Sequence, residues 1–275
     1  MITHQKFFAR FFSTIAAIAF GLVCLSVTVC EAGEIVIGTD SRIVDLGYPL
    51  NAKNAFWPGD NYTPFEVHTI ATLENDGVLS KAFSMPEHLG THIDAPNHFE
   101  ADQPGVDQLM LKDLCGPGVV IDISMKAEVD ADAMLTVDDV QAWEVEHGRI
   151  PDRGIVLLMT GWGRFWDNPI RYQNRDARGQ LHFPSFSPEA AEFLIKERGA
   201  LGIGLDNMSI DRGISKKFEV HHIVNKATRF GLENVAHLDL LPPRGFSVIV
   251  APIKIENGTG GPARIWAILD SLTEN

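Results

Sequence analysis

Short runs of apolar and β-branched residues recur along this chain, and polar or glycine-rich stretches separate them. Runs of this length and composition predict β-strands that are buried on at least one face. The expected strands are residues 34–37, 65–72, 119–123, 155–160, 201–205, 247–252 and 264–269.

Two segments between these runs predict helices because their ends carry capping residues. Thr136 can cap a first helix, which should run to His147 and stop at Gly148. Ser187 can cap a second helix that has a proline in its first turn and ends at Gly199. A strand candidate follows each helix, so the chain is expected to form one mixed α/β domain. The number of strands argues against a simple doubly wound sheet.

The N-terminus has a different pattern from the rest of the chain. Lys6 and Arg10 precede an uncharged, mostly apolar run over residues 11–30, and a short cleavage-site pattern follows. This order is typical of an export signal. We therefore expect a signal peptide at residues 1–32, a domain at 33–275, and a periplasmic or secreted protein. The apolar run is about long enough to span a bilayer, so an uncleaved anchor is the alternative.

Composition and charge narrow the class of partner. Hydrophobic residues make up 45% of the chain and charged residues 21%, which is ordinary for a protein with a sizeable core. The net charge of −13 argues against nucleic acid, and against an anionic membrane once the signal is cleaved. Only Cys115 lies outside the expected signal, so we expect no internal disulfide, and we expect Cys115 to be a small buried residue and not a nucleophile.

Residues 88–98, called here the histidine segment, contain an excess of metal-binding side chains. Three of the chain's ten histidines, His88, His92 and His98, lie there with Asp94. Neutral imidazole and carboxylate groups are the side chains that bind divalent metals near neutral pH. The segment therefore predicts a metal site, and a metal site suggests hydrolysis.

The expected backbone conformation of this segment indicates which of these side chains can reach the same metal ion. Pro96 argues against a helix, and on an extended strand His92 and Asp94 point to the same side. Gly90 permits a tight turn that could bring His88 to the same ion. Such a set leaves coordination positions open for water, as catalytic sites do. His98 could be a fourth ligand or a separate general acid or base.

A second group of histidine and glutamate residues lies downstream, in residues 219–222 and 233–237. Only folding could bring this group to the first. A solvated charged stretch is the alternative interpretation.

The pattern His-x-Gly-Thr-His-x-Asp-x-Pro-x-His of the histidine segment resembles the signature of the cyclase family, which includes bacterial kynurenine formamidases and isatin hydrolases. Segments that begin at Phe56, His182, Gly202 and Gly258 are also similar to family segments, and the last three resemble the isatin hydrolase branch. Residues 206–211 read Asp-Asn-Met-Ser-Ile-Asp where such relatives often have Asp-Thr-Leu-Ser-Ile-Asp. That difference leaves substrate choice open.

The resemblance implies an α/β fold of the swivelling β/β/α type, with a mixed sheet and flanking helices, and a homodimer or higher homo-oligomer. It implies that His88, His92 and Asp94 are ligands of a first metal ion and that His98 is the catalytic histidine. The implied cofactor is Mn²⁺ or Zn²⁺, as one or two ions.

In the two-metal members, a histidine and a glutamate twelve residues apart complete a second site. His221 and Glu233 have this separation, and the adjacent His222 is an alternative ligand. Glu233 would hold a second ion or orient the catalytic water.

These observations together predict a metal-dependent hydrolase that cleaves an amide C–N bond of a small aromatic substrate. An isatin-type cyclic amide and N-formylkynurenine are both candidates, and Trp57, Phe65, Trp162 and Trp166 could pack against a flat ring. One alternative is a hydrolase of another small lactone, ester or cyclic amide. The other is a non-catalytic exported protein that binds a metal or an aromatic acid.

Overall fold

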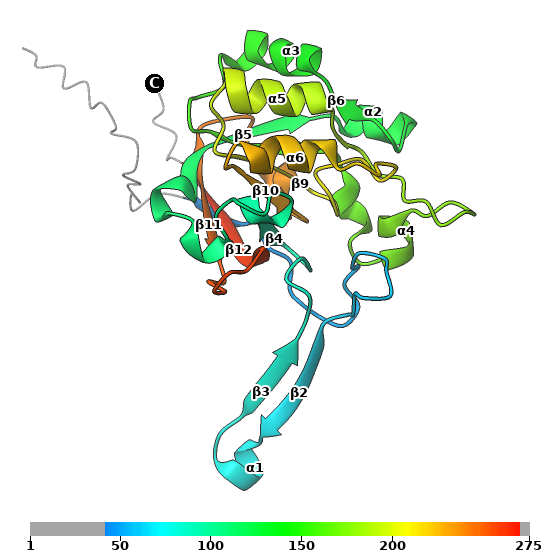
Figure 1. Cartoon of the computed structure of the whole chain (residues 1–275), viewed down its shortest axis with the longest axis vertical. Coiled ribbons are helices and arrows are strands. Elements are labelled where there is room, and N and C mark those ends of the chain that lie inside the picture. Colours follow the sequence, from blue (N-terminus) through cyan, green and yellow to red (C-terminus); the bar gives the residue numbers. More distant parts are fainter. Residues whose placement is uncertain (1–41, 270–275) are drawn as a thin grey trace, which may run out of the picture. The chain divides into compact units, whose positions relative to one another are not determined.

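The computed structural model describes residues 42–269, which form one large mixed sheet with helices packed against it (Figure 1). The strand order is β1-β12-β11-β5-β7-β9-β10-β4, and β4 also pairs with β12, which closes the sheet into a ring. Neighbours from β5 to β10 are parallel and the other pairs are antiparallel. The strands of this sheet are β1 (Arg42–Asp45), β4 (His92–Asp94), β5 (Cys115–Asp122), β7 (Ile155–Met159), β9 (Gly202–Leu205), β10 (Phe230–Glu233), β11 (Phe246–Pro252) and β12 (Gly260–Leu269).

Six α-helices and two small sheets complete the described part of the chain. The helices are α1 (Leu73–Asp76), α2 (Ser124–Val129), α3 (Val137–His147), α4 (Pro169–Gln173), α5 (Pro188–Glu197) and α6 (Glu219–Lys226). The small sheets pair β2 (Glu66–Ala71) with β3 (Ser80–Ser84), and β6 (Met134–Leu135) with β8 (Ser185–Phe186). Short 3₁₀ turns lie at Pro96–His98, Val106–Gln108, Leu111–Asp113, Trp162–Phe165 and Leu238–Leu240.

Both predicted helices form where their caps place them. The hydroxyl of Thr136 accepts a hydrogen bond from the first turn of α3, and Gly148 ends that helix with a φ of 83°. Ser187 accepts from the first turn of α5, which ends just before Gly199. The mixed α/β prediction is therefore confirmed.

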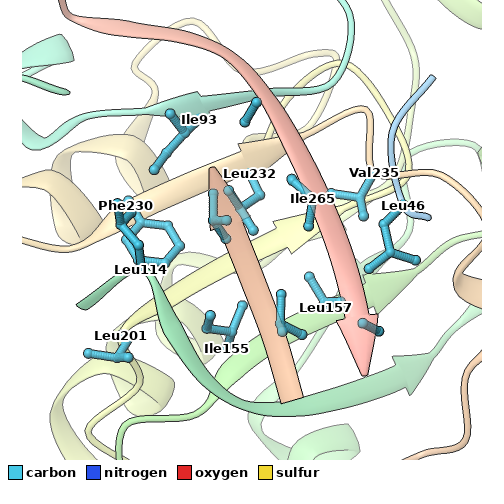
Figure 2. Close-up of a cluster of buried hydrophobic side chains, with 14 of the residues drawn as sticks. Leu46, Ile93, Leu114, Ile155, Leu157, Leu201, Phe230, Leu232, Val235 and Ile265 are labelled. Atoms are coloured by element: carbon cyan, nitrogen blue, oxygen red, sulfur yellow. The ribbon is translucent and has the colours of Figure 1, made fainter. Parts of the chain in front are cut away.

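Side chains of the central strands alternate between the two faces of the sheet, and each face packs into a separate hydrophobic core. Ile155 and Leu157 of β7 face a cluster enclosed by the ring of strands (Figure 2), whereas Val156 and Leu158 face a cluster that includes side chains of α3, α5 and α6. Successive side chains of a strand point to opposite faces, so a strand buried on both sides is apolar throughout. Truncation of Leu157, which is fully buried, would cost about 2–5 kcal/mol of stability.

The expected strand at 65–72 forms β2, but it pairs with β3 in a hairpin outside the main sheet, with α1 between the two strands. Val67, Ile70 and Phe83 of this hairpin are 51%, 62% and 59% exposed. The expected strand at 34–37 and the signal peptide at 1–32 lie outside the described residues. No helix within residues 42–269 is long and apolar enough to cross a membrane.

Candidate active site

Strand β4 carries His92 and Asp94 into the interior, where both are almost fully buried. Its antiparallel register with β10 places Glu233 opposite His92. Side chains directly opposite each other in such a pair share a face of the sheet. His92 Nε2 accordingly lies 3.3 Å from Asp94 Oδ1 and 3.4 Å from Glu233 Oε2. The sheet thus brings together two groups that are far apart in the sequence.

A tight turn at Gly90, which has a φ of +71°, returns His88 to the same place. His88 Nδ1 lies 2.7 Å from Asp94 Oδ1, while its Nε2 lies 2.9 Å from the hydroxyl of Thr259. A Cβ at Gly260 would come within 2.5 Å of the His88 ring, so only glycine leaves room for it there. With Nε2 held by Thr259, Nδ1 is the His88 atom that faces the cluster.

His221 enters the cluster from the first turn of α6. Its Nε2 lies 3.5 Å from Asp94 Oδ2 and 3.3 Å from Glu233 Oε1. The neighbouring His222 is half exposed and pairs with Glu100 outside the cluster. The structure therefore places His221, and not His222, at the site.

Asp211 holds His221 in this position. Its Oδ2 lies 2.7 Å from His221 Nδ1 and accepts the backbone N–H of the same residue, and its Oδ1 accepts the N–H of Val220. One carboxylate therefore fixes both the start of α6 and the orientation of the imidazole, as partners of metal-binding histidines commonly do. Asp211 was not predicted as a site residue, because it lies eight residues before α6 and only the folded loop brings its carboxylate to the start of that helix.

His98 follows Pro96 in a 3₁₀ turn and stacks on His88, with ring centroids 3.8 Å apart. One of its ring nitrogens lies within 4.8 Å of ligand atoms of both Asp94 and His221. Burial lowers the pKa of His98 to about 3, against the opposing effect of the Asp94 carboxylate. The ring is therefore neutral near pH 7, and one of its nitrogens has a free lone pair.

The cluster has the properties of a cation site. Within residues 42–269, His92 Nε2 and Asp94 Oδ2 are buried without a hydrogen-bond partner, which is costly unless a ligand satisfies them. Burial disfavours the charged form of His92, yet the carboxylates of Asp94 and Glu233 outweigh it and raise its pKa to about 10. The site thus draws positive charge to itself, and these nitrogen and oxygen donors fit a divalent metal ion.

The cluster lies at one side of a cavity of about 260 Å³. Its aromatic lining is Phe56, Trp57, Tyr62, Phe99 and Phe218. Of the residues that the structure describes, no lysine or arginine lines this cavity. The walls can therefore pack a flat apolar ring but offer no basic side chain to an anionic group.

Three of the four aromatic residues proposed from composition lie elsewhere. Trp162 and Trp166 belong to a separate buried cluster, and Phe65 packs on Phe83 of the hairpin. Only Trp57 lines the cavity. Composition misplaced Trp162 and Trp166 because a large apolar side chain is equally suited to a core and to a pocket wall.

Comparisons with known proteins agree with this geometry. The family model "Cyclase" matches residues 44–212. The isatin hydrolase of Roseibium aggregatum is 34% identical over 85% of this chain and 89% of its own length. The kynurenine formamidase of Bacillus anthracis is 30% identical over 82% of this chain and 96% of its own length. A solved isatin hydrolase bound to the product analogue thioisatinate has a TM-score of 0.80 and 32% identity, and covers 84% of this chain and 93% of that one. The chain therefore belongs to the cyclase family.

Proposed function

We propose that this protein is a metal-dependent amidohydrolase whose substrate is a small, flat, uncharged aromatic cyclic amide of the isatin type. The observation that carries this proposal is one cavity that joins a buried histidine and carboxylate cluster to aromatic walls. The relatives named isatin hydrolase and kynurenine formamidase support the reaction class.

The charge of the cavity favours a cyclic amide over N-formylkynurenine. The latter carries an amino-acid group whose carboxylate would be most stable beside a basic side chain, because charge-assisted hydrogen bonds are stronger than neutral ones. Within residues 42–269 no lysine or arginine lines the cavity. An isatin-type substrate has no such group and places only its ring against the walls.

We propose that His88, His92, Asp94, His221 and Glu233 hold one or two Mn²⁺ or Zn²⁺ ions. The orphaned atoms His92 Nε2 and Asp94 Oδ2 support this assignment. A bound divalent ion would polarise the amide carbonyl and lower the pKa of a water towards neutrality.

The chain's own residues supply the proton transfers and the positioning. Neutral His98 would accept a proton from the attacking water at the ring nitrogen near Asp94 and His221, and would return it to the leaving nitrogen. Glu233 Oε2 would accept a hydrogen bond that orients the water, while its Oε1 accepts the N–H of Ile210. The aromatic walls would exclude other water from the reacting bond.

A spectrophotometric assay with isatin and N-formylkynurenine side by side, under Mn²⁺ and under Zn²⁺, tests this proposal. Ring opening and deformylation both change aromatic absorbance. We expect faster turnover of isatin. Exclusive turnover of N-formylkynurenine would contradict the substrate assignment, and binding without turnover would favour a capture protein. Activity on lactones or esters alone would favour the broader hydrolase alternative.

We further propose that the protein self-associates. The exposed apolar side chains of Val67, Ile70 and Phe83 on the hairpin support this, and Val67 and Phe83 are paired across its two strands. Soluble monomers rarely expose large apolar patches. Light scattering coupled to size exclusion should give at least twice the mass of the chain, and replacement of all three by serine should reduce it. A monomeric mass for the unaltered protein would contradict this proposal.

We propose that the protein is exported and that residues 1–32 are removed. The charged, apolar and small-residue order of this segment supports that proposal. Cell fractionation and N-terminal sequencing of the mature chain would test it. An uncleaved chain in the cytoplasmic fraction would contradict it.

A further inference from the structure

Phe218 has an unusual backbone conformation for an aromatic residue. Its φ of 51° and ψ of 46° are left-handed, a region in which a Cβ crowds the backbone and which glycine and asparagine occupy more readily. Such conformations persist where the surrounding structure holds them, and they occur most often at functional sites. The reason for a phenylalanine at this position has to come from its side chain.

The start of helix α6 does not explain this side chain. Phe218 occupies the N-cap position of α6 but makes no side-chain hydrogen bond to the helix. The corresponding residues of α3 and α5, Thr136 and Ser187, do make such bonds. In α6 the carboxylate of Asp211 accepts the first N–H groups instead. The N-cap position is thus free to carry an apolar ring.

Packing in the protein core does not explain the phenylalanine at position 218 either. Phe218 is only partly buried, and its ring lines the cavity beside the metal-binding cluster. Its ring centroid lies 5.3 Å from that of Phe99 and 6.0 Å from that of Trp57. The same centroid lies 5.9 Å from that of His221. The Phe218 ring therefore lies between the aromatic side chains of the cavity wall and His221, a proposed metal ligand.

We propose that Phe218 is a specificity-determining residue, and that it forms with Trp57 the wall against which the aromatic ring of the substrate packs. The inference rests on the proposed function and extends it to named residues. The left-handed turn directs the ring to the cavity at the cost of local strain. Loss of the ring should therefore weaken substrate binding without weakening the fold.

The test uses Phe218→Gly with Thr228→Gly as its matched control. Thr228 is exposed at the other end of α6, and its φ of 56° is also left-handed. Glycine should relieve backbone strain in both variants, so neither should melt well below the unaltered protein. For Phe218→Gly we expect a KM for isatin about tenfold higher, thioisatinate bound about tenfold more weakly, and an unchanged metal content. Thr228→Gly should match the unaltered protein in all three.

A lowered melting temperature for Phe218→Gly with unchanged KM and thioisatinate affinity would overturn the inference, because the ring would then serve only the fold. If that variant does not fold, Phe218→Leu carries the test. This variant keeps an apolar side chain and the backbone strain at position 218. It should raise the KM for isatin while its metal content stays normal. An unchanged KM would overturn the inference.

The proposed substrate and the proposed role of Phe218 can be contradicted by different results. An unaltered protein that binds thioisatinate through Phe218 but does not hydrolyse isatin would contradict the proposed substrate and leave the role of Phe218 standing. Hydrolysis of isatin with the same KM in Phe218→Gly would contradict only the role of Phe218. An unaltered protein that neither binds thioisatinate nor hydrolyses isatin would overturn both.

Discussion

Asn234 and His92 donate hydrogen bonds to the same acceptor, the carbonyl oxygen of Gly90. Asn234 Nδ2 and His92 Nδ1 each lie 2.8 Å from it. Because a carbonyl only accepts, His92 Nδ1 carries a proton, and its Nε2 faces Asp94 and Glu233. The hydroxyl of Tyr172 donates to Asn234 Oδ1 at 2.8 Å and fixes the orientation of the amide. A buried chain of bonds thus sets which nitrogen of His92 faces the proposed metal.

Tyr172→Phe should weaken metal binding by about tenfold, because the amide of Asn234 would lose the partner that orients it. Isothermal titration of the metal-free protein with Mn²⁺ or Zn²⁺ would measure this. Tyr48→Phe, which removes the hydroxyl of a ring stacked on Trp166, is the control and should bind metal normally. Equal affinity in Tyr172→Phe and the unaltered protein would show that the chain of bonds has no influence on the ion.

Asp211→Asn should lower both stability and metal affinity, since the carboxylate holds the start of α6 and His221 together. Loss of a helix cap costs about 1 kcal/mol. Asp139→Asn, in the capping box of α3, is the control: it should lose comparable stability but keep its metal affinity. Chemical denaturation and metal titration of both variants separate the two roles. Normal metal binding by Asp211→Asn would mean that Asp211 serves only the helix.

Stability should also depend on pH through His182, which lies 2.7 Å from Asp132. The hydrogen bond to Asp132 raises the pKa of His182 above its ordinary value. The pair therefore stabilises the fold below the unfolded pKa of about 6.5 and loses this contribution as the pH rises through the folded pKa.

The expected contribution of this partly exposed pair is about 0.5–1 kcal/mol. Urea unfolding at pH 5.5 should show the unaltered protein more stable than Asp132→Asn by this amount, and the difference should shrink by pH 8.5. A difference that grows with pH would contradict the assignment.

The sequence predicted the features that depend on interactions between residues close together in the chain. The caps at Thr136 and Ser187 placed both helices, and the spacing of His92 and Asp94 placed them on one side of a strand. Alternation did not reveal that the sheet closes, because the pairing of β4 with both β10 and β12 depends on contacts between distant segments. Strand β10, only four residues long, was missed altogether.

In the candidate site too, the local features were predicted from the sequence and the long-range contacts were not. The histidine segment was visible as a cluster, and family resemblance suggested His221 and Glu233, but spacing could not separate His221 from His222. The two histidines are told apart by their positions at the start of α6, where the ring of His221 points into the cluster and the ring of His222 points towards solvent. Phe218 was missed because a phenylalanine with a positive φ leaves no signal in the sequence.

A comparison of His92→Ala with His222→Ala, for bound metal and for hydrolysis of isatin, tests whether the buried cluster is a catalytic metal site. Both remove an imidazole, but only His92 lies in the cluster, whereas His222 pairs with Glu100 near the surface. We expect His92→Ala to lose the metal and the activity together, and His222→Ala to keep both. Full hydrolysis of isatin by metal-stripped His92→Ala would show that the reaction needs neither His92 nor the metal ion.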